Sequence, residues 1–91
     1  MPSRMGVFRR KVALGRYELT GHAKDEMEQD GFSIGDVKSA VYSSRIVGVQ
    51  HHGRGPRKYV VAGKAEDRRP LRLVCRLTAT GQLRIITVFG V

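Results

Sequence analysis

The fold is decided by residues 69–91, which read RPLRLVCRLTATGQLRIITVFGV. Two apolar runs, 71–78 and 83–89, flank a short polar joint, Ala-Thr-Gly. Both runs are rich in Leu, Ile and Val and too short for a typical helix, so they predict the two strands of a hairpin. A three-residue loop, with Gly81 at the position of positive φ, joins them best.

The register of this hairpin decides which side chains share a face. A three-residue loop places Leu77 opposite Leu83 and Arg76 opposite Arg84, whereas a two-residue loop would mix apolar and charged side chains. One face therefore needs a cover, and its members are Leu71, Leu73, Cys75, Leu77, Leu83, Ile85, Thr87 and Phe89. The other face carries Arg72, Arg76 and Arg84 among Val74, Ile86 and Val88.

The arginine face of the hairpin has two interpretations. Arg76 and Arg84 face each other in the predicted register, and like charges directly opposite are destabilising by up to about 1 kcal/mol. Either both guanidinium groups extend into water, or an anion such as a phosphate lies between them.

Length and composition limit the class of protein. A chain of 91 residues forms one domain with a single core. No apolar run approaches the roughly 20 residues of a membrane span, and the basic N-terminus lacks a signal-peptide core, so we expect a cytoplasmic protein. The single cysteine, Cys75, is expected to be a small buried hydrophobe in a reducing compartment.

The net charge of +9 is distributed unevenly along the chain. Residues 1–17 hold five basic and no acidic side chains, residues 18–44 carry a net charge of −4, and residues 45–91 hold ten basic against two acidic side chains. An acidic helical region beside a basic sheet predicts one cationic face. Such a face suits nucleic acid or an acidic protein, and anionic lipid less well.

The N-terminal part of the chain gives a weaker pattern. Residues 1–16 have no clear period, and we interpret them as a basic extension that could form a short strand or lie against the body, and that could make a second nucleic-acid contact. Residues 17–91 then form the single α+β domain, beginning with a short edge strand at 17–19.

Two helices are predicted next. The first covers residues 21–30 and is ended by Gly31 in the left-handed conformation. The second begins after Ser33, which forms a capping box with Asp36, and ends near residues 43–44.

Further strands are predicted at 46–50 and 58–63, joined by a flexible basic turn at 51–56. Helices that precede strands indicate the α+β class. We therefore expect two N-terminal helices packed on one face of a three- to four-stranded antiparallel sheet.

Three segments resemble a bacterial family known as a domain of unknown function, DUF4258. They are ELTGHAKDEMEQDGFSIGDVKSAV (18–41), GPRKYVVAG (55–63) and RPLRLVCRLTATGQLRIITVFG (69–90). Members of the family have a His-Ala pair that opens an acidic helix and a closing Arg-Pro-Leu strand. The family commonly has a histidine after Arg-Pro-Leu, where this chain has Arg72.

The resemblance implies a function. Members of the family resemble the RelE, BrnT and motility-regulator toxins, which have helices on an antiparallel sheet and cleave RNA without a metal. It therefore implies a RelE-like fold, a metal-independent endoribonuclease of the mRNA interferase type, and a cognate antitoxin of the zinc-finger or helix-turn-helix type. The residues alone leave an alternative, a non-catalytic module that binds RNA or an antitoxin through a basic sheet face.

Metal-free cleavage by the ribose 2′-hydroxyl needs a base, an acid and cations on the charged phosphorane. Arg72 and Arg76 are the candidate cations, because the guanidinium fork grips two phosphate oxygens. His22 is the candidate acid or base, and the alternative is a histidine that seats the first helix. Tyr59 could supply a proton, and the alternative is an aromatic side chain in the core.

Four further basic residues are candidates for binding RNA phosphates: Arg54, Arg57, Lys58 and Arg84. Arg54 lies in a Gly-Arg-Gly-Pro turn, which lacks the strand-to-helix context of a phosphate-binding loop. His51 and His52 are adjacent and no Cys or acidic cluster accompanies them, so neither a metal nor another cofactor is expected.

Overall fold

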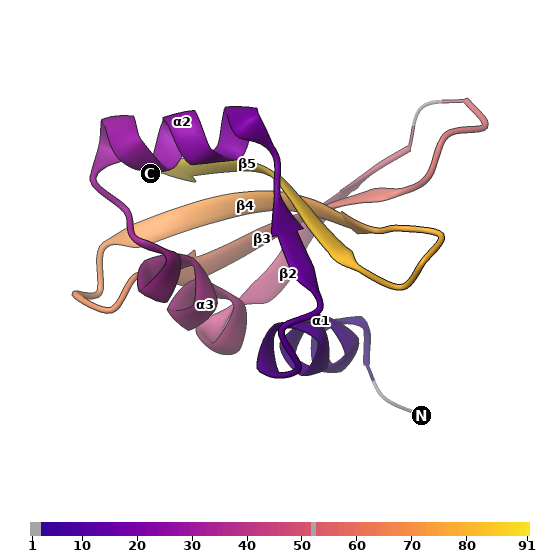
Figure 1. Cartoon of the computed structure of the whole chain (residues 1–91), viewed down its shortest axis with the longest axis horizontal. Coiled ribbons are helices and arrows are strands. Elements are labelled where there is room, and N and C mark those ends of the chain that lie inside the picture. Colours follow the sequence, from indigo (N-terminus) through magenta and orange to yellow (C-terminus); the bar gives the residue numbers. More distant parts are fainter. Residues whose placement is uncertain (1–2, 52) are drawn as a thin grey trace.

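The protein is described by a computed structural model that covers residues 3–51 and 53–91. Its strands form one five-stranded mixed sheet in the order β1-β5-β4-β3-β2 (Figure 1). The α+β class is confirmed. The elements, in chain order, are α1 (Arg4–Ala13), β1 (Tyr17–Leu19), α2 (Gly21–Asp30), α3 (Ile34–Ser43), β2 (Arg45–Gln50), β3 (Lys58–Lys64), β4 (Pro70–Leu77) and β5 (Leu83–Gly90).

The sheet differs from the predicted antiparallel one in its fifth strand. β1 pairs in parallel with β5, which places Tyr17 beside Leu83 and Leu19 beside Ile85. A strand of only three residues carries too little alternation to reveal its partner or direction. The sheet is therefore mixed rather than antiparallel.

The N-terminal segment, predicted as an extension that could form a short strand or lie against the body, forms helix α1 and packs on the body through its buried residues. The Ser3 hydroxyl caps it by accepting a hydrogen bond from Gly6 N at 3.0 Å. Phe8 and Val12 lie one turn apart and are buried, so this helix contributes to the core. Residues 1 and 2 lie outside the described residues.

Helices α1 and α3 cover one face of the sheet (Figure 1). The ring of Phe8 on α1 meets the ring of Tyr59 on β3 edge-on, with centroids 5.5 Å apart. On α3, the carbonyl of Ala40 lies so close to β3 that a Cβ at Gly63 would collide with it. Each helix has ten residues, and none in the described part of the chain is long and apolar enough to cross a membrane.

Helix α2 lies along the part of β5 that β1 leaves unpaired (Figure 1). Its Glu26 Oε1 accepts a hydrogen bond from Val88 N at 3.1 Å, and its Asp30 Oδ2 accepts one from Gly90 N at 3.2 Å. Two carboxylates therefore replace a neighbouring strand at this edge. As predicted, Gly31 ends the helix in the left-handed conformation, with φ of 70°.

The capping box predicted for the next helix is confirmed. Ser33 Oγ accepts from Asp36 N at 3.1 Å, and Asp36 Oδ2 accepts from Ser33 N at 2.9 Å. The other carboxylate oxygen of Asp36 accepts from Glu66 N at 3.0 Å, which ties the start of α3 to the β3–β4 turn.

The predicted hairpin register is confirmed next to the turn. Leu77 faces Leu83 and Arg76 faces Arg84, and Gly81 has φ of 83°. Beyond Cys75 the pairing shifts by one residue on β5.

This shift is a β-bulge at Ile86, and it changes the faces of the second half of β5. Val88 lies on the covered face and is fully buried. Thr87 and Phe89, predicted for the covered face, lie on the other one. The sequence does not reveal the bulge, because Ile86 and Val88 are both aliphatic. The pattern of β5 is therefore acceptable both with and without an extra residue at position 86.

Candidate nucleic-acid interface

The open face of the sheet, which we define as the face opposite α1 and α3, carries three rows of side chains. The register places each row across neighbouring strands. The first, which we call the cationic row, contains Glu18, Arg84, Arg76, Lys58 and Gln50. The second, the apolar row, contains Thr87, Val74, Val60 and Gly48. The third, the arginine–alanine row, contains Phe89, Arg72, Ala62 and Arg45.

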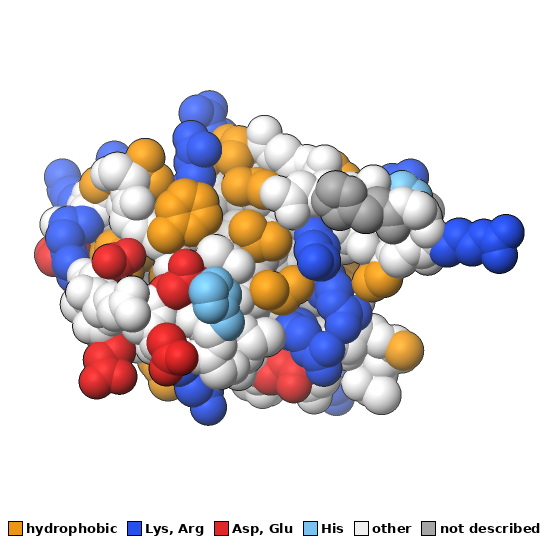
Figure 2. All heavy atoms as spheres, turned by 90° about the horizontal axis from the view of Figure 1, so that it is seen from above, with side chains coloured by type: hydrophobic (Ala, Val, Ile, Leu, Met, Phe, Trp, Pro, Cys, Tyr) orange, Lys and Arg blue, Asp and Glu red, His pale blue; other side chains and the backbone are white. Residues whose placement is uncertain are grey.

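Figure 2 looks onto this side of the molecule. Hydrophobic side chains occupy its middle, and Lys and Arg side chains gather on two sides of them. Acidic side chains lie along the border formed by α2. The polarity predicted from the charge distribution is therefore present, with the acidic helix at the margin of a basic sheet face.

Arg76 and Arg84 face each other, but they differ in their partners. Arg84 Nε donates to Glu18 Oε1 at 2.9 Å, so the neighbouring strand β1 neutralises it. Arg76 forms no ion pair within the described residues. The ion pair between Arg84 and Glu18 thus lowers the repulsion predicted between the two arginines. The guanidinium group of Arg76 is left without a carboxylate partner in the described residues.

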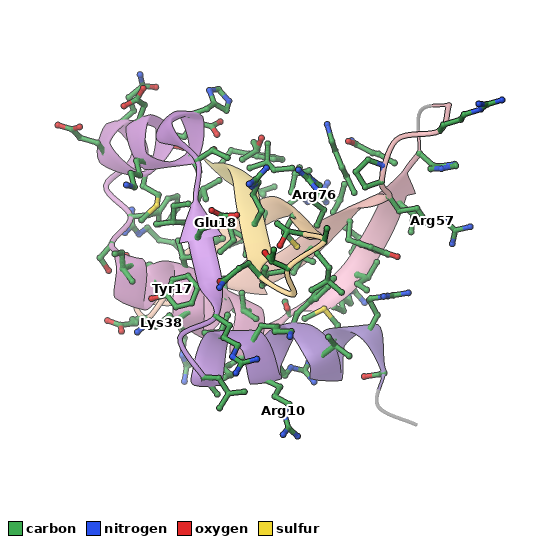
Figure 3. All side chains as sticks on the ribbon, turned by 45° about the vertical axis from the view of Figure 1, so that its right-hand side comes forward. Arg10, Tyr17, Glu18, Lys38, Arg57 and Arg76 are labelled. Carbon is green, nitrogen blue, oxygen red and sulfur yellow. The ribbon has the colours of Figure 1, made fainter. Side chains whose placement is uncertain are left out.

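The other predicted phosphate ligands fall into two groups. Lys58 begins β3 and extends the cationic row next to Arg76, since Tyr59 faces Cys75. Arg54 and Arg57 are exposed in the β2–β3 turn. Figure 3 shows Arg57 projecting from this turn, whereas Arg76 lies over the sheet. His52 in the same turn lies outside the described residues.

His22 lies in the first turn of α2, and its side chain is 69% exposed. Its Nε2 lies 3.2 Å from Glu26 Oε1, the oxygen that also accepts from Val88 N. This carboxylate can orient the imidazole. The strand β5 separates α2 from β4, and no interaction links His22 with Arg72 or Arg76 in the described structure.

Tyr59 requires a correction. Its ring lies on the covered face, is 8% exposed, and packs between Phe8 and the Arg4 guanidinium, which lies 5.2 Å from the ring centroid. The alternation of β3 therefore turns it away from Arg76, which is on the open face. Tyr59 is therefore a core residue, which was the alternative given for it, and it does not belong to a catalytic group on the open face.

Arg72 lies in the arginine–alanine row rather than beside Arg76. Ala62 stands between Arg72 and Arg45, because it faces both of them across its two neighbouring strands. Arg45 was not among the residues predicted for the site. The sequence indicates only that Arg45 precedes a predicted strand. Which face of the sheet its side chain occupies depends on the bulge between Ile46 and Gly48.

The remaining chemistry of the chain is limited. Burial raises the pKa of the Cys75 thiol to about 12, which keeps it protonated and unreactive, as expected for a core residue. Within residues 3–51 and 53–91, no three His, Cys, Asp or Glu side chains come together to hold a metal.

The fold and this face define the class: a small α+β protein whose mixed sheet has one helix-covered face and one open cationic face. The chain belongs to the DUF4258 family, described as a domain of unknown function, whose model matches residues 19–90. This confirms the family suggested by the sequence, and α1 lies outside the matched region. No curated protein and no solved structure matches the chain significantly.

Proposed function

We propose that the protein binds RNA on the open face of its sheet. The observation that carries this proposal is the pair of basic rows on either side of an apolar row, on a face that α1 and α3 leave open. In the described structure, Arg45, Lys58, Arg72 and Arg76 have no carboxylate partner.

The chemistry of the three rows matches that of a nucleic-acid strand. Guanidinium groups bind phosphate oxygens through paired hydrogen bonds, while apolar and aromatic side chains support bases and sugars. Phe89, at the end of the arginine–alanine row, is half-buried and offers one such aromatic surface. The affinity of such a face comes mainly from phosphate contacts and therefore depends strongly on salt.

The proposal is tested by fluorescence anisotropy with a labelled single-stranded RNA at several salt concentrations. Arg76→Gln should weaken binding and lower the slope of log K against log salt by about 0.7 for the phosphate contact that is lost. The matched control is Arg10→Gln, because Arg10 is exposed and projects from α1 away from the open face (Figure 3). Equal losses in both variants would show that only the net charge matters and would reject the open face as the site.

Cleavage of the bound RNA is a second candidate function, favoured by the contact between His22 and Glu26. A histidine paired with a carboxylate can take or give a proton, and Arg76 can stabilise the phosphorane. We expect cleavage in the presence of EDTA, its loss in His22→Gln, and unchanged RNA binding by that variant. If the wild-type protein leaves the RNA intact, cleavage is rejected and the proposed function is RNA binding alone.

The resemblance to toxins of the RelE, BrnT and motility-regulator type supports a further part of this proposal, an antitoxin partner of the zinc-finger or helix-turn-helix type. Expression of the protein alone should then arrest growth, and co-expression of the product of a neighbouring small gene should relieve the arrest. Normal growth in both cases, with RNA binding retained in vitro, favours the simple binding module.

A further inference from the structure

A cleft of about 390 Å³ opens at the end of the arginine–alanine row, where β2, β3 and β4 lie side by side. Its lining includes Arg45, Ala62, Lys64, Pro70 and Arg72. This volume lies within the range of small-molecule sites, and the cleft lies outside the cationic row that contains Arg76.

The register explains why the cleft exists. Ala62 faces Arg45 on one side and Arg72 on the other, so the two arginine Cα atoms lie about 10 Å apart with only a methyl group between them. Lys64 follows two residues later on β3, on the same face. The backbone N–H of Lys64 donates to Ser43 Oγ at 3.1 Å, which fixes the strand at this position. Three cationic side chains therefore line one hollow, whose apolar lining includes Ala62 and the buried Leu71.

The charges in this cleft have no internal partner. Arg45, Lys64 and Arg72 form no ion pair within the described residues. Arg69 shows the contrast: it lies 2.7 Å from Asp67 and donates to the carbonyls of Asp30 and Gly31, so its role is structural. Three uncompensated cations around one hollow repel each other unless an anion lies among them.

We propose that this cleft binds the phosphate group of a nucleotide. The two guanidinium groups and the ammonium group hold the phosphate, and Pro70 and Ala62 give an apolar surface for the sugar or the base. The inference rests on the proposed RNA binding in so far as the nucleotide belongs to an RNA strand. A free mononucleotide offers the same chemistry, and the experiment separates the two sources.

The test is an NMR titration of the ¹⁵N-labelled protein with AMP, with adenosine as the ligand that lacks the phosphate. AMP should shift the amide signals of residues 62–64 and 72, and adenosine should not. Ala62→Leu fills the hollow without changing the charge and should weaken AMP binding by about tenfold or more. The matched control is Ala79→Leu in the exposed β4–β5 turn, which should bind AMP like the wild type.

A second variant, Arg72→Gln, keeps the test valid should the larger side chain disturb the fold. It should also lose most of the AMP affinity while thermal unfolding stays unchanged. Inorganic phosphate that competes as strongly as AMP overturns the nucleotide assignment.

Labelled RNA separates this inference from the proposed function. RNA binding that is lost in Arg76→Gln but intact in Ala62→Leu, together with no AMP binding, overturns the cleft and leaves the RNA-binding face. AMP binding that Ala62→Leu abolishes, with no RNA binding by the wild type, supports the cleft with a free nucleotide as ligand and rejects the proposed function.

Discussion

At the scale of the residue, Asp36 shows how one carboxylate links parts of the chain that are far apart. It accepts hydrogen bonds from the backbone of Ser33 and of Glu66, and it lies 3.7 Å from Arg69. The bond from Ser33 is the main cause that holds the pKa of Asp36 below its ordinary value of 3.8, while burial acts against it. The ionised form is therefore the form that the fold requires.

We expect Asp36→Asn to lower the free energy of unfolding at neutral pH by about 2 kcal/mol, because hydrogen bonds to a charged acceptor are lost. The pKa of Asp36 is lower in the folded than in the unfolded state, so its contribution to stability is present above pH 3.8 and is lost as the pH falls through the folded pKa. The variant should therefore lose less stability on acidification. Urea unfolding across this pH range measures both effects.

The matched control for this experiment is Asp25→Asn, because Asp25 is an exposed carboxylate on α2. It should leave the free energy of unfolding nearly unchanged. A wild type and an Asp36→Asn variant that lose the same stability between neutral and acidic pH would contradict the role of this carboxylate.

At the scale of the element, the packing of α3 on β3 depends on the missing side chain of Gly63. A Cβ there would collide with the backbone of Ala40, which cannot move aside as a flexible side chain would. We expect Gly63→Ala to push the helix away from the sheet and to lower the free energy of unfolding by about 1–3 kcal/mol, the usual cost of overpacking. Chemical denaturation measures this loss.

Gly48→Ala is the control for this packing prediction. A Cβ at Gly48 would meet Val60 at 3.7 Å, an ordinary contact on the open face. This variant should therefore unfold at nearly the wild-type denaturant concentration, and equal destabilisation of both variants would argue against a specific close approach at Gly63.

Elements that depend on neighbouring residues could be predicted, and those that depend on distant ones could not. Gly31, Gly81 and the capping box of Ser33 act within one turn of the chain, and all were confirmed. The parallel pairing of β1 and the bulge at Ile86 depend on contacts distant in sequence, so local patterns left them out.

The candidate site follows the same division. The meeting of Arg76 and Arg84 followed from the turn alone. The neutralisation of Arg84 by Glu18 depends on where β1 pairs, and the pairing of Arg45 and Arg72 around Ala62 depends on the bulge in β2. None of these contacts leaves a pattern in the residues next to them.

At the scale of the whole molecule, α1 belongs to the core although the family match begins at residue 19. Phe8 is 1% exposed and packs on Tyr59. We expect Phe8→Ala to lower the free energy of unfolding by about 3–5 kcal/mol, as for other buried phenylalanines. Thermal and urea unfolding measure the change.

Leu14→Ala is the control for this core prediction, since Leu14 follows α1 and is 57% exposed. It should unfold much like the wild type. A Phe8→Ala variant that is as stable as this control would contradict the role of Phe8 in the core.

The bulge at Ile86 also bears on how this strand can vary among relatives. It divides β5 into two phases, with Ile85 inward before it and Val88 inward after it. If the bulge closed with every residue retained, Thr87 would face the helices and Val88 would face outward, whereas deletion of Ile86 would give an unbroken alternation that keeps Val88 inward. Relatives that share this fold should therefore keep a buried aliphatic side chain at the position of Val88, whether or not they carry the extra residue at position 86.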